Sequence, residues 1–364
     1  MAERSIKEYV VRKGAAKRIP VSGTFELTSR CNLNCKMCYI HTSPEEQDAM
    51  GRELTTEEWL RVGREAVAEG MIYLLLTGGE PLLRPDFLTL YTEMIRMGVL
   101  ISINTNGTRI TPEVLDCFQK YKPEKVNITL YGMSDASYTR LCGVKNQWET
   151  VLANIRALKE AGIRVNLNTT FTRYNIGDME AIVDFAKAEG IPVRMSSFIF
   201  PPVRNQHEPD DINLTPEEMG KAAARFDRLT MNDEQLEKRM RYVSHCLEGK
   251  KIRETDVPES RISSCMAGRG AFWISWDGYM YPCGMLSDFH ENIRSCSMQD
   301  AWRKTCETVK QMYLPPECSV CKYQPLCPSC AAVSQCCNGR TDALVPAVCT
   351  RTKTYADAFL HGET

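Results

Sequence analysis

The sequence predicts an α/β fold, in which helices cover a parallel sheet, followed by a small cysteine-rich region. Apolar runs typical of buried strands alternate with amphipathic helical segments between residues 23 and 198. Polar or glycine-rich segments directly follow five of these runs, and 11 of the 17 cysteines lie between residues 265 and 349. Pro and Gly interrupt that second region, as expected of a small domain held by metal clusters rather than by an apolar core.

The composition is that of a globular chain without a charge bias. Its 364 residues suffice for roughly two domains. Because 45 Lys and Arg balance 46 Asp and Glu, the overall charge favours neither nucleic acid nor a membrane as partner. The longest apolar runs, such as 71–76, fall far short of the roughly 20 residues that span a bilayer, and the charged start lacks a signal-peptide pattern. We therefore expect a cytoplasmic protein, whose reduced cysteines serve as metal ligands rather than as a disulfide framework.

Six apolar runs are expected to form strands. The first, 24–28, precedes a helix over 55–69 that begins at a capping box of Thr55 and Glu58. The other five runs are 72–76, 99–103, 125–130, 163–167 and 191–195. A glycine precedes four of them, at positions 70, 98, 162 and 190, as expected where a helix ends in a left-handed residue. Periodicity alone leaves open whether the six strands form a barrel-like sheet or an open, doubly wound one.

The unusual segments all follow strands, so they are expected to share one edge of the sheet. They are 31–38 after the first strand, 77–81 after the second, 104–107 after the third, 129–132 at the end of the fourth and 168–170 at the end of the fifth. In parallel α/β folds this edge, at the carboxyl ends of the strands, is where ligands bind.

The segment 31–38 holds three thiols, Cys31, Cys35 and Cys38. Three thiolates from one loop suit a cubic iron–sulfur cluster that keeps one iron free of protein ligands, because a fourth cysteine would close the site. The spacing C-x3-C-x2-C resembles that of radical S-adenosylmethionine (SAM) enzymes. This resemblance implies a partial (β/α)6 barrel of TIM type and a [4Fe–4S] cluster that binds SAM. It also implies that one electron breaks a sulfonium bond to give a 5′-deoxyadenosyl radical.

The same resemblance implies which residues bind SAM. Gly78, Gly79, Glu80 and Pro81 match the family's GGEP segment, which receives the methionine ammonium and where glycines let the backbone approach the ligand. Further polar contacts are assigned to Asn106, Thr129 and Asn168, and the SAM carboxylate to Arg140. The position before the third cysteine, usually aromatic, is Met37, and Tyr39 follows that cysteine.

The carboxy-terminal cysteines resemble those of the SPASM domain of peptide-modifying radical SAM enzymes. The resemblance implies two auxiliary [4Fe–4S] clusters, the first held by Cys265, Cys283 and Cys330 and the second by Cys318, Cys321, Cys327 and Cys349. A hairpin signal at Asp277-Gly278 is expected to bring Cys265 and Cys283 together.

Two departures from the SPASM pattern concern the first cluster. The interval before Cys330 is two residues where three are usual, and no cysteine precedes Cys265 within 258–264. The fourth iron is therefore either open to substrate or bound by Cys246, Cys336 or Cys337. Zinc is the alternative for the whole region, although zinc ribbons separate their cysteine pairs by roughly 15–20 residues, whereas these pairs are much closer.

We divide the chain by composition into five parts. These are a basic, solvated N-terminal arm (1–20), the barrel (21–235, with a Pro- and charge-rich connection over 201–211), a helical linker (236–261), the SPASM domain (262–352) and a C-terminal tail (353–364). Most of the remaining cysteines are expected to be inert, but Cys142, near Arg140, is a candidate hydrogen donor to a substrate radical.

The resemblance to maturases of ribosomally made peptides implies hydrogen abstraction from a peptide, followed by crosslinking or another oxidation. A reductant such as flavodoxin or ferredoxin is then needed. The stretch before the first strand is expected to be too short for a leader-binding domain, so a separate protein or the basic arm is expected to recognise the leader. The alternatives are maturation of a protein, as in sulfatase maturation, a small-molecule substrate, or a non-catalytic iron–sulfur carrier or zinc scaffold.

Overall fold

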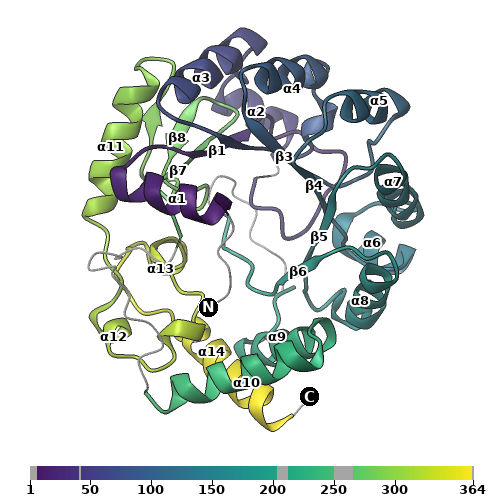
Figure 1. Ribbon diagram of the computed structural model, residues 1–364, viewed down its shortest axis with the longest axis vertical. Coiled ribbons are helices and arrows are strands. Elements are labelled where there is room, and N and C mark those ends of the chain that lie inside the picture. Colours follow the sequence, from purple (N-terminus) through teal and green to yellow (C-terminus); the bar gives the residue numbers. More distant parts are fainter. Residues whose placement is uncertain (1–5, 41, 203–211, 250–264, 363–364) are drawn as a thin grey trace.

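A computed structural model describes residues 6–40, 42–202, 212–249 and 265–362 of the chain (Figure 1). The strands are β1 (Ser22–Glu26), β2 (Tyr73–Thr77), β3 (Leu100–Thr105), β4 (Lys125–Thr129), β5 (Val165–Thr170), β6 (Val193–Ser196), β7 (Ala271–Ile274), β8 (Tyr279–Tyr281) and β9 (Glu291–Asn292). The helices of the barrel region are α1 (Ile6–Lys17), α2 (Pro44–Met50), α3 (Thr56–Ala68), α4 (Phe87–Arg96), α5 (Pro112–Lys120), α6 (Asp135–Cys142), α7 (Trp148–Glu160), α8 (Met179–Ala188) and α9 (Pro216–Thr230). The remaining helices are α10 (Asp233–Leu247), α11 (Met298–Lys310), α12 (Pro316–Ser319), α13 (Ala331–Asn338) and α14 (Pro346–His361).

The six predicted strands form a partial parallel barrel. Their order in the sheet, β6-β5-β4-β3-β2-β1, follows the chain without a reversal. A doubly wound sheet would contain a point where the order reverses, so the open alternative is excluded and the partial (β/α)6 barrel is confirmed. Helices α3, α4, α5, α7 and α8 lie outside the curved sheet (Figure 1).

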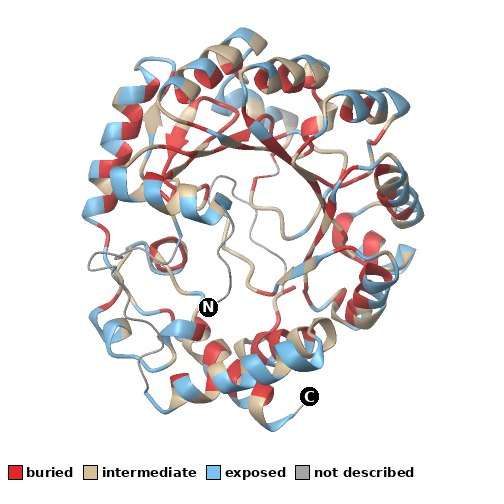
Figure 2. Ribbon diagram, viewed as in Figure 1, coloured by how far each residue is buried: buried red, intermediate tan, exposed pale blue. Residues whose placement is uncertain are grey.

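The apolar core lies between the strands and these outer helices. Phe25 of β1 packs on Trp59 of α3 with ring centroids 4.9 Å apart, and both side chains are fully buried. Helix α3 begins at the predicted capping box, in which Thr55 accepts from the backbone of Glu58. Buried positions on the outer helices face the sheet (Figure 2), so the core fixes where each strand ends.

The inner face of the barrel is polar. Asn127 Nδ2 donates to Asn104 Oδ1 at 2.8 Å, and Asn166 Nδ2 donates to Asn127 Oδ1 at 3.4 Å. This ladder of three half-buried asparagines runs across β3, β4 and β5 in register. Thr129 and Asn168 come two residues later on β4 and β5, so they lie on the same face, one step nearer the carboxyl rim.

The cysteine-rich region extends the barrel sheet. Strand β7 pairs in parallel with β1, and β8 pairs antiparallel with β7, which confirms the predicted hairpin. Trp273 Nε1 donates to the buried Glu26 carboxylate at 3.0 Å, although 247 positions separate the two residues. The sequence did not predict this continuation of the sheet.

The two chain ends differ from the expectations. The basic arm contains helix α1, whose Lys7 pairs with Glu124 at 2.8 Å and whose Gly14 packs against Val21, so it is not a freely solvated segment. The expected tail forms most of helix α14, which buries Tyr355 and Phe359 against α9 and α10. Helix α10 occupies the start of the predicted linker, whereas 250–261 and most of the 201–211 connection lie outside the described residues. None of the described helices is long and apolar enough to cross a membrane.

Candidate metal centre

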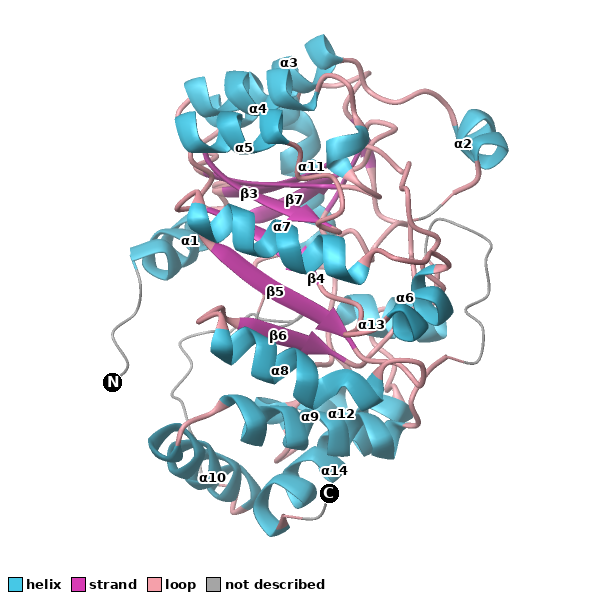
Figure 3. Cartoon of the chain, turned by 90° about the vertical axis from the view of Figure 1, so that its right-hand side faces the viewer, coloured by secondary structure: helices cyan, strands magenta, loops and turns pink. Residues whose placement is uncertain are grey.

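The three thiols of the first loop lie at the carboxyl ends of the strands. In Figure 3 the strands β5 and β6 point toward this rim, and α1 lies at the opposite end of the barrel. The loop is held by α6, because the backbone N–H groups of Asn34 and Lys36 donate to the carbonyls of Cys142 and Leu141 at 2.9 and 3.0 Å. The end of α6 therefore sets the path of the chain between Cys31 and Cys38.

The thiols of Cys31, Cys35 and Cys38 are half-buried and close enough to influence one another. Burial, together with the neighbouring Cys35, Glu80 and Cys38, raises the pKa of Cys31 to about 12, against a lowering by the Leu33 N–H. A bound cation favours the thiolates, so this thiol set suits a metal cluster rather than three free, charged cysteines.

Two residues that the sequence analysis did not place at the loop lie beside these thiols. The pKa of Cys35 is raised well above its usual range, chiefly by a hydrogen bond to Cys142 and next by burial. Tyr131, after β4, also hydrogen-bonds Cys35, and burial together with the surrounding thiols raises the Tyr131 pKa. Cys142 is fully buried, and this placement favours a packing role beneath the loop over hydrogen donation to a substrate.

Backbone hydrogen bonds join the Gly78–Pro81 segment to the residues just before Cys31. The Gly79 N–H donates to Thr28 O at 2.8 Å and the Glu80 N–H donates to Arg30 O at 2.8 Å. A Cβ at Gly79 would collide with the Arg30 carbonyl and lie 2.6 Å from that of Ser29. Gly78 adopts a φ of 151°, and a Cβ there would lie 2.6 Å from Thr28 O. Only glycine therefore allows this contact.

Glu80 and Asn106 connect the second and third strand ends to the cysteine loop. The buried Glu80 carboxylate accepts from the Asn106 N–H at 2.7 Å, the Leu82 N–H at 3.1 Å and the Thr105 hydroxyl at 2.8 Å. The Asn106 side chain lies 3.7 Å from Cys31 Sγ and donates to Asn32 Oδ1 at 3.0 Å. One asparagine thus contacts both the thiol loop and the glycine-rich segment.

Burial raises the pKa of Glu80 from 4.5 to about 7, although its three hydrogen-bond donors and Arg109 lower it. Because the folded-state pKa is the higher one, the stabilising contribution is complete below about pH 4.5 and is lost as the pH rises through about 7. We expect the free energy of unfolding, measured without SAM relative to Glu80→Gln, to fall by about 2 kcal/mol between about pH 5.5 and 8. Denaturant titrations of both proteins test this, and parallel pH profiles would contradict it.

The other predicted SAM contacts are only partly brought together. Thr129 and Asn168 are register partners at the rim, and Pro81 begins a 3-10 turn over Pro81–Leu83. Tyr39 is half-buried just after Cys38. Arg140 is exposed on α6, and no hydrogen bond or ion pair is described for it. The roles of these residues in binding SAM stay predictions.

Arg84 is a positioning residue that no motif indicated. Its guanidinium is buried and donates to Leu27 O at 2.9 Å and Leu54 O at 3.3 Å, and it pairs with Asp86 at 2.7 Å and Glu53 at 3.1 Å. Glu53 in turn accepts from Thr28 and Arg30. This network fixes the chain as it leaves β1 toward Cys31.

We expect Arg84→Met to lower the free energy of unfolding by about 3–5 kcal/mol, because it leaves two carboxylates and two carbonyls without their partner. The matched control is Arg96→Met on α4, which removes the exposed Arg96–Glu93 pair and should change the stability far less, because solvent screens that pair. Denaturant midpoints of the two variants compare them directly, and equal losses would show that the Arg84 network is not structural.

In the C-terminal region, the structure brings together the four cysteines predicted for the second auxiliary cluster. Cys318 and Cys321 flank the end of α12, Cys327 follows the 3-10 turn over Gln324–Leu326, and Cys349 lies on α14. Burial, together with the nearby Cys327, Cys349 and Cys321, raises the pKa of Cys318 to about 11, so the four thiols lie near one another.

Of the cysteines predicted for the first auxiliary cluster, Cys330 lies at the start of α13. Cys330 caps the start of this helix, and burial raises its pKa together with the nearby Cys265 and Cys327. Cys283 instead interacts with Cys336, farther along α13. In the described part of the chain no three Cys, His, Asp or Glu side chains meet closely enough to chelate a single metal ion. The thiolates of a four-iron cluster stand farther apart than that, because the irons and sulfides lie between them.

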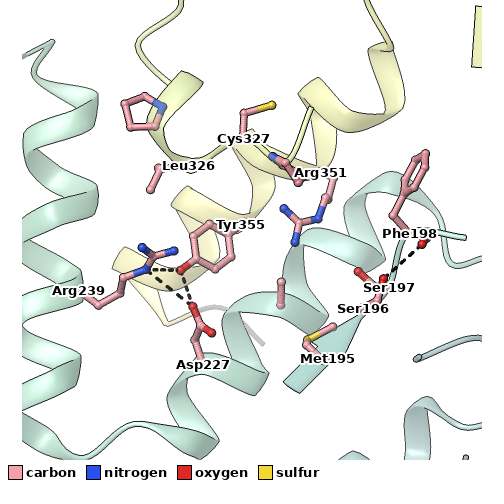
Figure 4. Close-up of a pocket in the computed structure, with 13 residues that line it drawn as sticks. Met195, Ser196, Ser197, Phe198, Asp227, Arg239, Leu326, Cys327, Arg351 and Tyr355 are labelled. Carbon is pink, nitrogen blue, oxygen red and sulfur yellow. Dashed lines mark hydrogen bonds and ion pairs between the residues drawn. The ribbon is translucent and has the colours of Figure 1, made fainter. Parts of the chain in front are cut away.

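A cavity of about 370 Å³ lies between the end of β6 and the cysteine-rich region. In Figure 4, Arg351 lies below Cys327 and to the right of the pair formed by Tyr355 and Asp227. Tyr355 donates to Asp227 at 2.6 Å and accepts from Arg239 at 2.8 Å. Partial burial lowers the Arg351 pKa, and the nearby Cys327 opposes this, so a half-buried cation lies beside a predicted cluster ligand.

The residues at the barrel rim fit an open iron–sulfur cluster and a small polar ligand. Three thiols share one loop, the backbone at Gly78 and Gly79 leaves no room for a side chain, and the buried Ser29 hydroxyl has no hydrogen-bond partner among the described residues. The donor set contains sulfur but no imidazole, as is typical of [4Fe–4S] clusters.

Comparisons with known proteins agree on the kind of fold. Residues 25–186 match the model of the Radical SAM superfamily. The sequence is 26% identical over 328 residues to the AdoMet-dependent heme synthase of Methanosarcina barkeri, covering 85% of this chain and 90% of that protein. It is 32% identical over 167 residues to the PqqA peptide cyclase of Ruegeria pomeroyi, covering 46% of this chain and 44% of that protein. The fold resembles that of anSMEcpe, solved with AdoMet and the Cp18Cys peptide, with a TM-score of 0.68 at 18% identity over 93% of this chain and 96% of that one.

Proposed function

Through residues 25–186 the chain belongs to the radical SAM superfamily, and from this premise we propose that it abstracts hydrogen from a peptide residue to install a crosslink or another oxidative modification. The chain is an enzyme, as its named relatives are, so the carrier and scaffold alternatives are set aside. The main observation in support of this proposal is the position of Asn106, which contacts both the Cys31 thiol and the Glu80 carboxylate.

When bound, the cluster of Cys31, Cys35 and Cys38 with SAM would supply the electron and the 5′-deoxyadenosyl radical. The chain's own residues position and shield that chemistry. Gly78 and Gly79 let the backbone approach the methionine portion, and Asn106 orients Cys31 relative to this segment. Tyr131 and the buried Cys142 exclude water from beneath the loop.

A peptide is the substrate class that we favour. The PqqA peptide cyclase is 32% identical over 167 residues of this chain, and the C-terminal thiols form two groups, as a pair of auxiliary clusters requires. The cavity between β6 and Cys327 offers Arg351 and Arg239 to a carboxylate of the substrate or its leader. In this proposal a ferredoxin or flavodoxin delivers electrons, and a separate protein or the basic segment of α1 recognises the leader.

A second candidate is a small-molecule reaction. The heme synthase of Methanosarcina barkeri aligns over 85% of this chain, which is enough to include at least part of the cysteine-rich region, whereas the peptide cyclase aligns over 46%. A porphyrin carries carboxylates, and the same two arginines would pair with them.

The test is anaerobic reconstitution with iron, sulfide, dithionite and SAM, followed by mass spectrometry. We expect 5′-deoxyadenosine, and a loss of two hydrogens from a small peptide encoded beside this gene. The same reaction with an iron porphyrin as substrate is the matched alternative. A mass change in the porphyrin but not in the peptide would replace the peptide proposal with the small-molecule one, and the absence of 5′-deoxyadenosine would overturn both.

A further inference from the structure

Helix α13 carries two cysteines toward the segment that follows Cys283. Cys330 is the residue before its first turn, and Cys336 lies near its end. The Cys336 thiol donates to Met285 O at 3.2 Å, two residues past Cys283. The far end of α13 is therefore fixed over this segment, as its start is fixed beside Cys265.

Two further contacts hold α13 in this position. Gln335 Nε2 donates to Asp288 Oδ2 at 2.6 Å, one residue before Cys336. On the apolar side, Ala331 and Ala332 pack with the fully buried Leu286. A polar and an apolar contact thus both hold α13 against the 283–289 segment.

The other two candidates for the fourth ligand lie elsewhere or face outward. Cys246 is buried in the apolar cluster that α9, α10 and α14 form, which contains none of the other cysteines of the first set. Cys337 is exposed at the end of α13. The Cys336 thiol instead contacts Met285 O, in a segment that packs in one cluster with Cys283 and Cys330.

We propose that Cys336 is the fourth thiolate of the first auxiliary cluster, together with Cys265, Cys283 and Cys330. This rests on the auxiliary clusters of the proposed function. Binding forms one iron–sulfur bond, releases the thiol proton to solvent and changes no oxidation state. Four thiolates close the cluster, so its role is electron transfer, and substrate does not bind to its iron.

The test uses the full chain with Cys31, Cys35 and Cys38 changed to alanine, so that only auxiliary iron remains. This parent should hold about eight irons with matching sulfide, from two four-iron clusters. Adding Cys336→Ala should expose one iron, seen as a three-iron electron paramagnetic resonance (EPR) signal after mild oxidation, as coupling to added ¹³C-cyanide, or as a loss of about four irons. Adding Cys337→Ala, the matched control, should leave iron content and spectra as in the parent.

Cys336→Ser covers the case in which the alanine variant does not fold. Its oxygen keeps the iron coordinated, and we expect an altered EPR signal and a more negative potential than in Cys337→Ser. If the Cys336 variants match the Cys337 variants in iron content and spectra, the inference fails while the auxiliary clusters stand. If the parent binds no iron and sulfide, or binds only zinc, the auxiliary clusters of the proposed function fail and the inference with them.

Discussion

Changing Cys31, Cys35 and Cys38 together to alanine is expected to reduce 5′-deoxyadenosine formation to the background of a protein-free reaction. The three thiols share one half-buried loop that α6 and the Gly78–Pro81 segment hold in place. With no thiolate left in this loop, no iron can present an open position beside Asn106, so the electron that cleaves SAM has no donor. Chromatography of the anaerobic reaction mixture measures the product.

The matched control for this variant is Cys117→Ala, which removes a half-buried thiol from the outer helix α5. It should keep full activity and iron content, whereas the triple variant should lose about four irons per chain and keep the auxiliary iron. Undiminished 5′-deoxyadenosine from the triple variant would show that another group cleaves SAM, and the proposed function would fall.

Gly79→Ala is expected to have the second largest effect, a loss of both stability and SAM affinity. The added methyl group would collide with the Arg30 carbonyl and lie 2.6 Å from that of Ser29, both parts of the backbone and therefore unable to rotate away. The segment must then move away from the thiol loop and lose the two hydrogen bonds from Gly79 and Glu80. We expect about 1–3 kcal/mol less stability and a SAM affinity weakened by roughly a hundredfold, since displacements near 1 Å have such effects at reactive sites.

Gly177→Ala is the control for the glycine change, because a Cβ there meets no atom within 4 Å. Equilibrium dialysis with SAM on the reconstituted proteins gives the affinities, and denaturant titration gives the stabilities. A Gly79→Ala protein that binds SAM as tightly as Gly177→Ala does would separate this segment from the SAM site.

Local patterns in the sequence were enough for the barrel strands and the thiol loop. Strand β5 alternates buried and half-buried positions along its length, and the capping box at Thr55 begins α3 as predicted. The hairpin at Asp277-Gly278 also follows from its turn residues. Such features depend on residues only a few positions apart, so they can be predicted from local sequence patterns.

Contacts between distant segments could not be predicted in this way. Strand β7 joins β1, Arg84 reaches the carbonyls of Leu27 and Leu54, and neither contact leaves a mark in local periodicity. The segment after residue 352 contains few signals of burial, yet α14 packs its aromatic residues on α9. These pairings depend on which surfaces remain uncovered once the barrel has formed.

The sequence by itself determined the chemistry available to this protein, namely sulfur ligands in one loop, a glycine-rich segment at the next strand end and a second group of thiols near the C-terminus. Only the tertiary structure decided how those groups are divided: Cys142 lies beneath Cys35, Asn106 joins Cys31 to Glu80, and α13 places Cys336 beside Cys283. The physical reason is that residue type and spacing fix what a side chain can bind. The distance between two side chains far apart in the chain is set by the packing of the elements that carry them.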